Sequence, residues 1–365
     1  MTLKPVYIHD FNCVTPLGAD LDRNWESLLA GQIGLTSQKI GFLPEVFASK
    51  IEASALANYA WPSGTRLEKM MYEAVAPIRA RHQPTTRTAF IVATTKGNIS
   101  DLRNAATDQA LLTQLADRLA KAMDISTTPI IVSHACVSGV LAVAVAKRLI
   151  QMGSYDDAIV LAGDEVGEFV VSGFQAFQAM SPFPCKPFDK NRAGVSLGEA
   201  TACVYISATA GSFEIVGESS INDANHISGP SRTGEGLYQS VRGALLEAGL
   251  TAADIDYISA HGTATAYNDE MEAIAFNRLA LSNVPVNSLK GVYGHTLGAS
   301  GLLETVIGLK CMIEGLLIPT AGFEEMGVSQ PLHLLKQLQQ KNISYFLKTA
   351  SGFGGSNAAL IIKKV

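Results

Sequence analysis

The chain has 365 residues, of which 47% are hydrophobic, so it can bury a large core in about one to three domains. Its net charge of -5 excludes the strongly basic surface of a typical nucleic-acid-binding protein. The five cysteines form no C-x-x-C pair, which favours reduced thiols over disulfides or a zinc site. Without a signal-peptide core or an apolar run of membrane-spanning length, we expect a cytoplasmic protein with no membrane partner.

Short apolar runs alternate with longer amphipathic segments through the first half of the chain. Residues 34–65 interrupt this pattern with mixed polarity, and we expect them to be mostly irregular. The predicted elements, in chain order, are a strand at 6–8, helices at 22–30 and 66–81, a strand at 89–93, one or two helices within 101–122, strands at 130–132 and 158–163, and a hairpin over 194–206.

The second half repeats the alternation. Its predicted elements are a strand at 213–217, a helix at 236–248, a strand at 255–260, a helix at 269–281 and a final hairpin over 345–362. Strands alternating with helices predict an α/β fold with buried sheets.

Residues 129–153 combine a buried strand, a turn carrying Cys136 and an apolar helix that ends near Gly153. A helix N-terminus presents free N–H groups and the positive end of the peptide dipole. Both favour a thiolate, so we predict that the pKa of Cys136 lies below about 8.5. The same N–H groups can hold an oxyanion after the sulfur attacks a carbonyl. A small buried hydrophobe is the alternative reading of a lone cysteine.

The segment 137–153 has a counterpart at 299–315. Both segments begin with x-Ser-Gly, and the spacing from Gly139 to Gly153 equals that from Gly301 to Gly315. The hairpin segments 198–206 and 354–362 also correspond. We therefore predict two copies of one α/β unit, residues 1–210 and 211–365, with the two similar helices buried against each other.

Two histidines, His261 and His295, lie beside glycines where predicted strands run into loops. A lone histidine in such a place is more often structural. Together with Cys136, however, the pair suits acyl transfer, because the sulfur can carry an acyl group while two imidazoles polarise a second carbonyl.

At this point the sequence resembles the β-ketoacyl-acyl carrier protein synthases of the thiolase-like superfamily, from Val6 to Ile362. The segments that carry the resemblance are Val14–Gly18, Ala135–Gly139, Lys186–Asp189, Gly198–Glu199, His261–Thr263 with Asp269 and Glu272, Lys290 with Gly294–His295 and Gly298–Ala299, and Gly352–Gly355 with Asn357. The resemblance implies two duplicated βαβαβαββ-type halves in five α-β-α-β-α layers. The first half would carry the cysteine and the second half the two histidines.

The resemblance also implies a decarboxylative Claisen condensation. Cys136 would hold the acyl chain as a thioester, and His261 and His295 would bind the carbonyl of malonyl-carrier protein. Lys290 would favour the neutral form of both histidines through like-charge repulsion. Phe353 would gate the acyl pocket, and its N–H would join that of Cys136 in an oxyanion hole.

Thr263, Thr265, Phe353 and Gly354 are the implied substrate-binding residues. We expect no metal and no cofactor of the protein's own, because acyl groups arrive on the phosphopantetheine of an acyl carrier protein. That carrier is acidic. Arg66 and Lys69 stand at i, i+3 on one predicted helix and are therefore candidates for docking it.

The remaining alternatives concern the partner and the pathway. The chain is expected to form a homodimer or a heterodimer with a related synthase subunit. A non-catalytic subunit like a chain length factor is the alternative function, although such subunits usually lack the cysteine that is present here. Fatty-acid elongation and aryl-polyene-type polyketide elongation both stay open.

Overall fold

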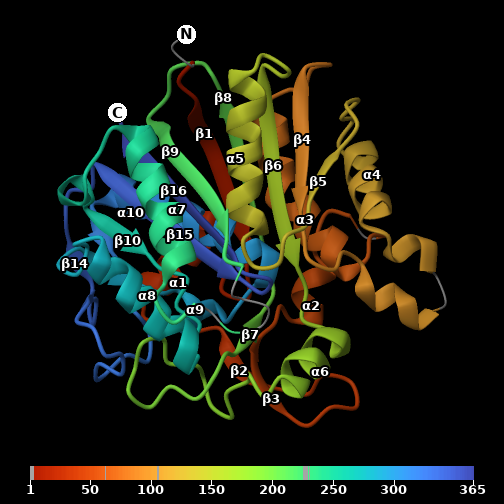
Figure 1. The fold of residues 1–365 in the computed structure, drawn as a ribbon. Helices are drawn as coiled ribbons and strands as arrows, with labels where there is room; N and C mark the ends of the chain where they lie inside the picture. The colour runs from red at the N-terminus through yellow and green to blue at the C-terminus, as the bar shows by residue number, and fades with distance from the viewer. Residues whose placement is uncertain (1–3, 62, 105–106, 225–228, 230) are drawn as a thin grey trace.

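The computed structural model describes residues 4–61, 63–104, 107–224, 229 and 231–365 (Figure 1). The α-helices are α1 (Leu21–Leu29), α2 (Ala53–Leu56), α3 (Arg66–Arg81), α4 (Leu112–Ala122), α5 (Ser138–Gln151), α6 (Glu168–Ala176), α7 (Glu235–Ala248), α8 (Ala266–Arg278), α9 (Lys290–Tyr293) and α10 (Ser300–Glu314). The 3-10 helices are η1 (Ile99–Asn104), η2 (Thr107–Ala110), η3 (Ala252–Asp254) and η4 (Leu297–Ala299). The helix or helices expected within 101–122 are thus η1, η2 and α4, with residues 105–106 outside the described part.

The strands form one large sheet and two small ones. The large sheet has the order β13-β11-β10-β15-β16-β9-β1-β8-β6-β4-β5. Its strands are β1 (Tyr7–Val14), β4 (Thr88–Ala93), β5 (Ile130–Val132), β6 (Asp157–Asp164), β8 (Ala200–Ser207), β9 (Phe213–Asn222), β10 (Tyr257–Ser259), β11 (Pro285–Asn287), β13 (His333–Leu334), β15 (Tyr345–Gly352) and β16 (Ser356–Lys364). The small sheets pair β2 (Leu35–Gln38), β3 (Val46–Ser49) and β7 (Leu197–Gly198), and β12 (Leu316–Leu317) with β14 (Gln339–Gln340).

Successive side chains along a strand point to opposite faces of the sheet, and each face packs against a different layer of helices. On β4, Ile91 packs in the core cluster that contains α5 and α10, whereas Phe90 packs with α3 and α4 on the other face. On β15, Phe346 likewise faces the central helices, and Leu347 faces the cluster with α7 and α8. The expected α-β-α-β-α arrangement is therefore present, with α5 and α10 in the middle layer (Figure 1).

The two sheet layers are joined through β1 and β9. These strands pair antiparallel at Tyr7↔Glu214 and Ile8↔Phe213. The predicted division of the chain at residue 210 falls between β8 and β9 and stays a prediction. The final hairpin is confirmed, because β15 and β16 pair antiparallel from Tyr345↔Lys363 to Gly352↔Ser356.

The two repeated helices contact each other at their glycines. A Cβ on Gly139 of α5 would lie 2.7 Å from the backbone nitrogen of Leu302 in α10. A Cβ on Gly301 would in turn lie 2.6 Å from Cγ2 of Val140 and 3.1 Å from its backbone nitrogen. Glycine at both positions lets the helix N-termini approach closely, which brings the loops before them together.

One expectation about local structure is confirmed and one is wrong. The segment 34–65 is mostly irregular, with only the short elements β2, β3 and α2 in it. The segment 194–206 is not a hairpin, since β7 pairs with β3 while β8 pairs with β1 and β6. The backbone hydrogen bonds of β7 and β8 go to strands far away in the chain, so the local sequence does not reveal them.

Candidate active site

Cys136 lies in the turn between β5 and α5, at the carboxyl edge of the parallel strands β4, β5 and β6. The preceding Ala135 has φ +44°, an uncommon left-handed conformation that turns the chain sharply before the helix. A Cβ on Gly352 would lie 3.1 Å from the backbone nitrogen of Cys136. The end of β15 thus packs directly against the cysteine.

Parallel strands bring the second-half residues to a shared edge. His261 follows β10, Lys290 lies just after β11, and Phe353 follows β15, while β10 pairs in parallel with both β11 and β15. His295 lies in the loop between α9 and η4. The sequence-predicted residues Cys136, His261, His295 and Phe353 all line one cavity of about 550 Å³.

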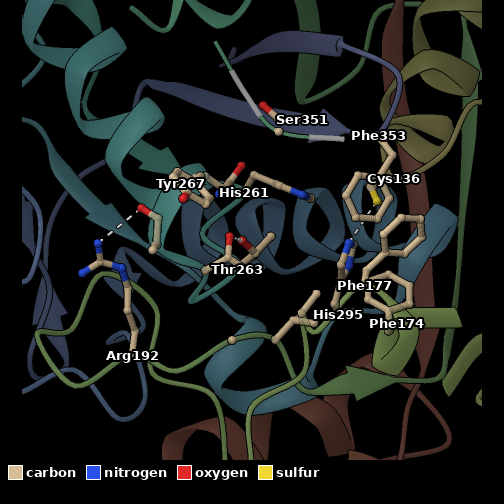
Figure 2. Close-up of a pocket in the computed structure, with 18 of the residues that line it drawn as sticks. Cys136, Phe174, Phe177, Arg192, His261, Thr263, Tyr267, His295, Ser351 and Phe353 are labelled. Carbon is tan, nitrogen blue, oxygen red and sulfur yellow. Dashed lines mark hydrogen bonds between the residues drawn. The ribbon is translucent and has the colours of Figure 1, made fainter. Parts of the chain in front are cut away.

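The sulfur of Cys136 and the ring nitrogens of His261 and His295 lie close together (Figure 2). His295 Nε2 lies 3.0 Å from the Sγ atom of Cys136, and the rings of His261 and His295 are 5.1 Å apart at 84°. Figure 2 shows Arg192 and Tyr267 far from the cysteine, with Thr263 between. The cavity therefore runs from a reactive end at Cys136 to a polar end near Arg192.

The hydrogen bonds of His295 fix its neutral tautomer. The backbone N–H of Leu297 donates to Nδ1 at 3.2 Å, and the Ser300 hydroxyl lies 2.9 Å from the same nitrogen. Because Nδ1 accepts a hydrogen bond, the ring proton of the neutral form sits on Nε2. His295 therefore presents an N–H donor to the cavity.

Lys290 fixes the tautomer of His261 in the same way. Its ammonium group lies 3.3 Å from His261 Nδ1 and donates to the His261 carbonyl oxygen at 2.6 Å. An ammonium group has only donors, so Nδ1 must accept and Nε2 must carry the proton. The two imidazoles thus present two N–H groups that can both donate a hydrogen bond to one carbonyl oxygen.

A buried ion cluster lies beneath the histidines and was not predicted from the sequence. Glu304 in α10 accepts from Lys290 at 2.7 Å and pairs with Lys348 in β15 at 2.6 Å. Both lysines are fully buried. The sequence did contain a signal for this cluster: Glu304 and Lys348 are charged residues within the apolar runs 302–309 and 345–350.

Burial and this cluster keep the histidines neutral. Burial lowers the pKa of His261 well below its usual 6.5, and the positive charges of Lys290 and Lys348 lower it further. Burial, Lys290 and Lys348 act in the same direction on the pKa of His295. The predicted role of Lys290 toward the histidines is consistent with these contacts.

The expected low pKa of Cys136 is wrong for this structure. The residue is only 6% exposed, and burial raises the pKa of its thiol to about 11. The charges of Lys290 and Lys96 and the N–H of Phe353 lower the pKa, but burial outweighs them. The thiol is therefore protonated at rest, and its reactivity depends on donors that stabilise the sulfur as it becomes anionic.

Aromatic rings close the reactive end of the cavity. The Phe353 N–H points to the Cys136 sulfur, while the Phe353 ring lies 5.9 Å from Phe174 and 5.7 Å from Phe177. Phe353 is 41% exposed and lies before Gly354 and Gly355, both at φ +86°. This backbone combines an inward N–H with a side chain at the cavity mouth.

The other predicted substrate residues divide into two groups. Thr263 and Thr265 line the cavity, and their hydroxyls lie 2.8 Å apart. Gly354 is beside the cavity but does not line it, and open space faces its Cα. The cavity also includes Arg192 and Asn268, which the sequence reasoning did not select.

The Cys136, His261 and His295 ligand atoms lie within 4.8 Å of one another, close enough to hold a metal ion. The positive charges of Lys290 and Lys348 nearby oppose a cation there. The donor arrangement therefore fits a carbonyl oxygen better than a metal.

The predicted docking pair, Arg66 and Lys69, requires correction. The Arg66 Nε atom lies 3.0 Å from both carboxylate oxygens of the fully buried Glu199, and the guanidinium also donates to the Ile51 carbonyl. Its side chain is 21% exposed. Arg66 is thus held by the interior because it neutralises Glu199. Of the predicted pair, the half-exposed Lys69 stays the candidate for docking.

Comparisons with known proteins find relatives over most of the chain. The family model of the beta-ketoacyl synthase N-terminal domain matches residues 69–210, and that of the C-terminal domain matches residues 212–324. A protein of Schizosaccharomyces pombe, provisionally named a mitochondrial 3-oxoacyl-[acyl-carrier-protein] synthase, is 29% identical over 99% of each chain. The 3-oxoacyl-[acyl-carrier-protein] synthase 2 of Rhizobium meliloti is 34% identical over 63% of this chain and 59% of its own.

Solved structures show the same architecture. A chain from the complex of a ketosynthase with its chain length factor from Xenorhabdus doucetiae has a TM-score of 0.89 and 26% identity, covering 99% of this chain and 98% of that one. A beta-ketoacyl synthase from Burkholderia phymatum has a TM-score of 0.87 and 23% identity over the whole of both chains, which shows the fold. Among the described residues, none of the helices has the length and apolarity to cross a membrane.

Proposed function

Because the chain belongs to the β-ketoacyl synthase family and is an acyltransferase-type enzyme, we propose that it condenses an acyl thioester on Cys136 with malonyl-carrier protein. The observation that carries the proposal is the convergence of one thiol and two imidazole N–H donors in one cavity. Such a set serves both halves of a decarboxylative condensation.

In the first half-reaction, the Cys136 sulfur attacks the carbonyl carbon of an acyl thioester. The carbonyl electrons move to oxygen, where the N–H groups of Cys136 and Phe353 can stabilise the charge. The bond from carbon to the carrier's sulfur then breaks. The thiol proton leaves with the carrier's thiolate, and the acyl chain stays on Cys136.

In the second half-reaction, the two Nε2–H groups donate to the thioester carbonyl of malonyl-carrier protein. The bond to the carboxylate breaks, carbon dioxide leaves, and the electron pair forms an enolate held by His261 and His295. The enolate carbon attacks the acyl carbon, the bond to Cys136 breaks, and the thiolate takes a proton from water. The product is a β-ketoacyl thioester on the carrier.

The proposed partners follow from the same chemistry. Acyl and malonyl groups arrive on the phosphopantetheine of an acyl carrier protein, so the enzyme needs no cofactor of its own. We expect Thr263 and Thr265, which line the cavity, to contact the phosphopantetheine arm. Lys69 is the proposed docking cation.

We also propose a subunit partner, either a second copy or a related subunit. A solved relative pairs a ketosynthase with its chain length factor. The edge strand β5 has a free side in the large sheet, and its three apolar residues are half-buried in the single chain. Aryl-polyene-type elongation and fatty-acid elongation are the two proposed pathways, and the protein would act in the cytoplasm.

Half-reaction assays of His261→Ala and His295→Ala test the proposal. Both variants should still take an acyl group onto Cys136, detected by intact-protein mass spectrometry. Both should lose malonyl-carrier decarboxylation by about 10²-fold, the cost of one oxyanion donor. Near wild-type decarboxylation in both variants would overturn the roles. No acylation of wild-type Cys136 by any carrier would favour the non-catalytic subunit instead.

A further inference from the structure

Asp164 is a buried acid beside the site that the condensation does not use. It is the last residue of β6 and is 1% exposed. Its Oδ1 accepts from the Thr94 hydroxyl at 3.0 Å and the Thr95 hydroxyl at 3.0 Å. Its Oδ2 accepts from the backbone N–H of Gly298 at 2.7 Å and that of Thr95 at 3.1 Å.

Two of these contacts come from backbone N–H groups, which can only donate, and both threonine hydroxyls are able to donate to Oδ1. The arrangement therefore suits the ionised carboxylate, although burial raises the pKa of Asp164. Thr94 and Thr95 follow β4 in the first half of the chain, whereas Gly298 lies in η4, directly after the loop that carries His295. The carboxylate therefore ties that loop to the sheet edge that carries Cys136.

The loop needs such a tie because its backbone is strained. Leu297 has φ +52°, a left-handed conformation that non-glycine residues rarely adopt. The N–H of this same residue donates to His295 Nδ1. A Cβ on Gly298 would lie 2.8 Å from Asp164 Oδ2, so glycine at that position permits the close approach of the carboxylate.

We propose that Asp164 is a positioning residue that holds the 295–298 turn in its strained form, so that His295 keeps its Nε2–H donor in the cavity. The inference rests on the proposed function of His295. The carboxylate acts through the Gly298 N–H, one residue after the N–H that fixes the His295 tautomer.

Asp164 also acts on the cysteine by charge. The charged and titratable groups near the Cys136 thiol are Lys290, Lys96, Asp164, His261 and His295. The two lysines lower the pKa of Cys136, and the carboxylate of Asp164 raises it. Replacing Asp164 by a neutral residue should therefore lower the pKa of Cys136, an effect that a purely structural tie would not have.

The test compares Asp164→Asn with Asp157→Asn, which changes the first residue of the same strand at its far end. Asparagine keeps the size but replaces one acceptor oxygen by a donor. Asp164→Asn should reduce malonyl-carrier decarboxylation by about tenfold or more, as expected for a misplaced catalytic group. Acyl loading should change by less than about threefold, and the pH profile of Cys136 alkylation should move to lower pH. Asp157→Asn should change neither half-reaction nor the profile.

Thr95→Val provides a milder variant if Asp164→Asn folds poorly, because it removes only the hydroxyl donor. It should lower decarboxylation in the same direction by a few-fold, with acyl loading retained. Equal losses in both half-reactions, or an unchanged decarboxylation rate and alkylation profile, would overturn the inference. His295→Ala, measured in parallel, separates the two proposals: if it retains decarboxylation, the proposed function itself fails.

Discussion

Replacing Lys290 by methionine tests whether the buried cation sets the protonation of the histidine pair. Methionine fills a similar volume but removes the charge that lies 3.3 Å from His261 Nδ1. Two unit charges at that distance interact by about 5 kcal/mol at an effective dielectric constant of about 20. Because 1.36 kcal/mol corresponds to one pKa unit, the upper limit of the effect is about 3–4 units.

The neighbouring charges reduce this limit. Glu304 lies 2.7 Å from the Lys290 ammonium and partly cancels its field, while Lys348 remains in the variant. We therefore expect the pKa of His261 to rise by at least about one unit. The sign follows from repulsion: the cation disfavours the imidazolium, so its removal lets each ring take a proton at higher pH.

Histidine ring NMR on uniformly labelled protein measures this directly. In the wild type, the signals of His261 and His295 should stay neutral on acidification through pH 6.5, with the proton on Nε2. In Lys290→Met, the His261 signal should titrate at higher pH and show a mixture of tautomers. Assignment uses His261→Gln and His295→Gln. Identical titration curves and tautomers in wild type and variant would refute the reasoning.

Three further predictions concern the thiol, the docking helix and the cavity mouth. Limiting iodoacetamide should label Cys136 before the other four cysteines, because it alone among them lines the cavity; peptide mapping that finds another cysteine first would contradict this. Arg66→Met should lower the unfolding free energy by about 3 kcal/mol by leaving buried Glu199 with the weaker partner Lys50, whereas Lys69→Glu should raise only the KM for the carrier. Phe177→Ala removes an exposed ring against Phe353, so stopped-flow acyl loading should accelerate about 2–10-fold with an unchanged Tm.

Local sequence patterns predicted the elements that bury one continuous face. The helix at 66–81 has the expected bounds because its apolar residues recur at helical spacing and Thr65 with Glu68 form a capping box at its start. The cysteine and both histidines were found from residue type beside glycine-rich turns. Those turns are local features, and the parallel strands then place them at shared edges.

Long-range electrostatics accounts for what the sequence did not reveal. The thiol at a helix N-terminus was expected to be acidic, yet burial by residues from the second half outweighs the local dipole. Arg66 appeared as a surface cation because its partner, Glu199, is 133 residues away. Glu304 and Lys348 meet Lys290 from separate elements of the second half, and Asp164 contacts Gly298 across the two halves. No spacing rule predicts these contacts.

The contact between Cys136 and His295 joins residues 159 positions apart. During synthesis, the first half leaves the ribosome while the histidines and Phe353 are still untranslated, and domains generally fold from the N-terminus onward. The nascent chain thus holds a cysteine with no imidazole beside it and no second oxyanion donor. In the proposed mechanism, the oxyanion hole is therefore complete only after β15 has entered the sheet and brought the Phe353 N–H to the sulfur.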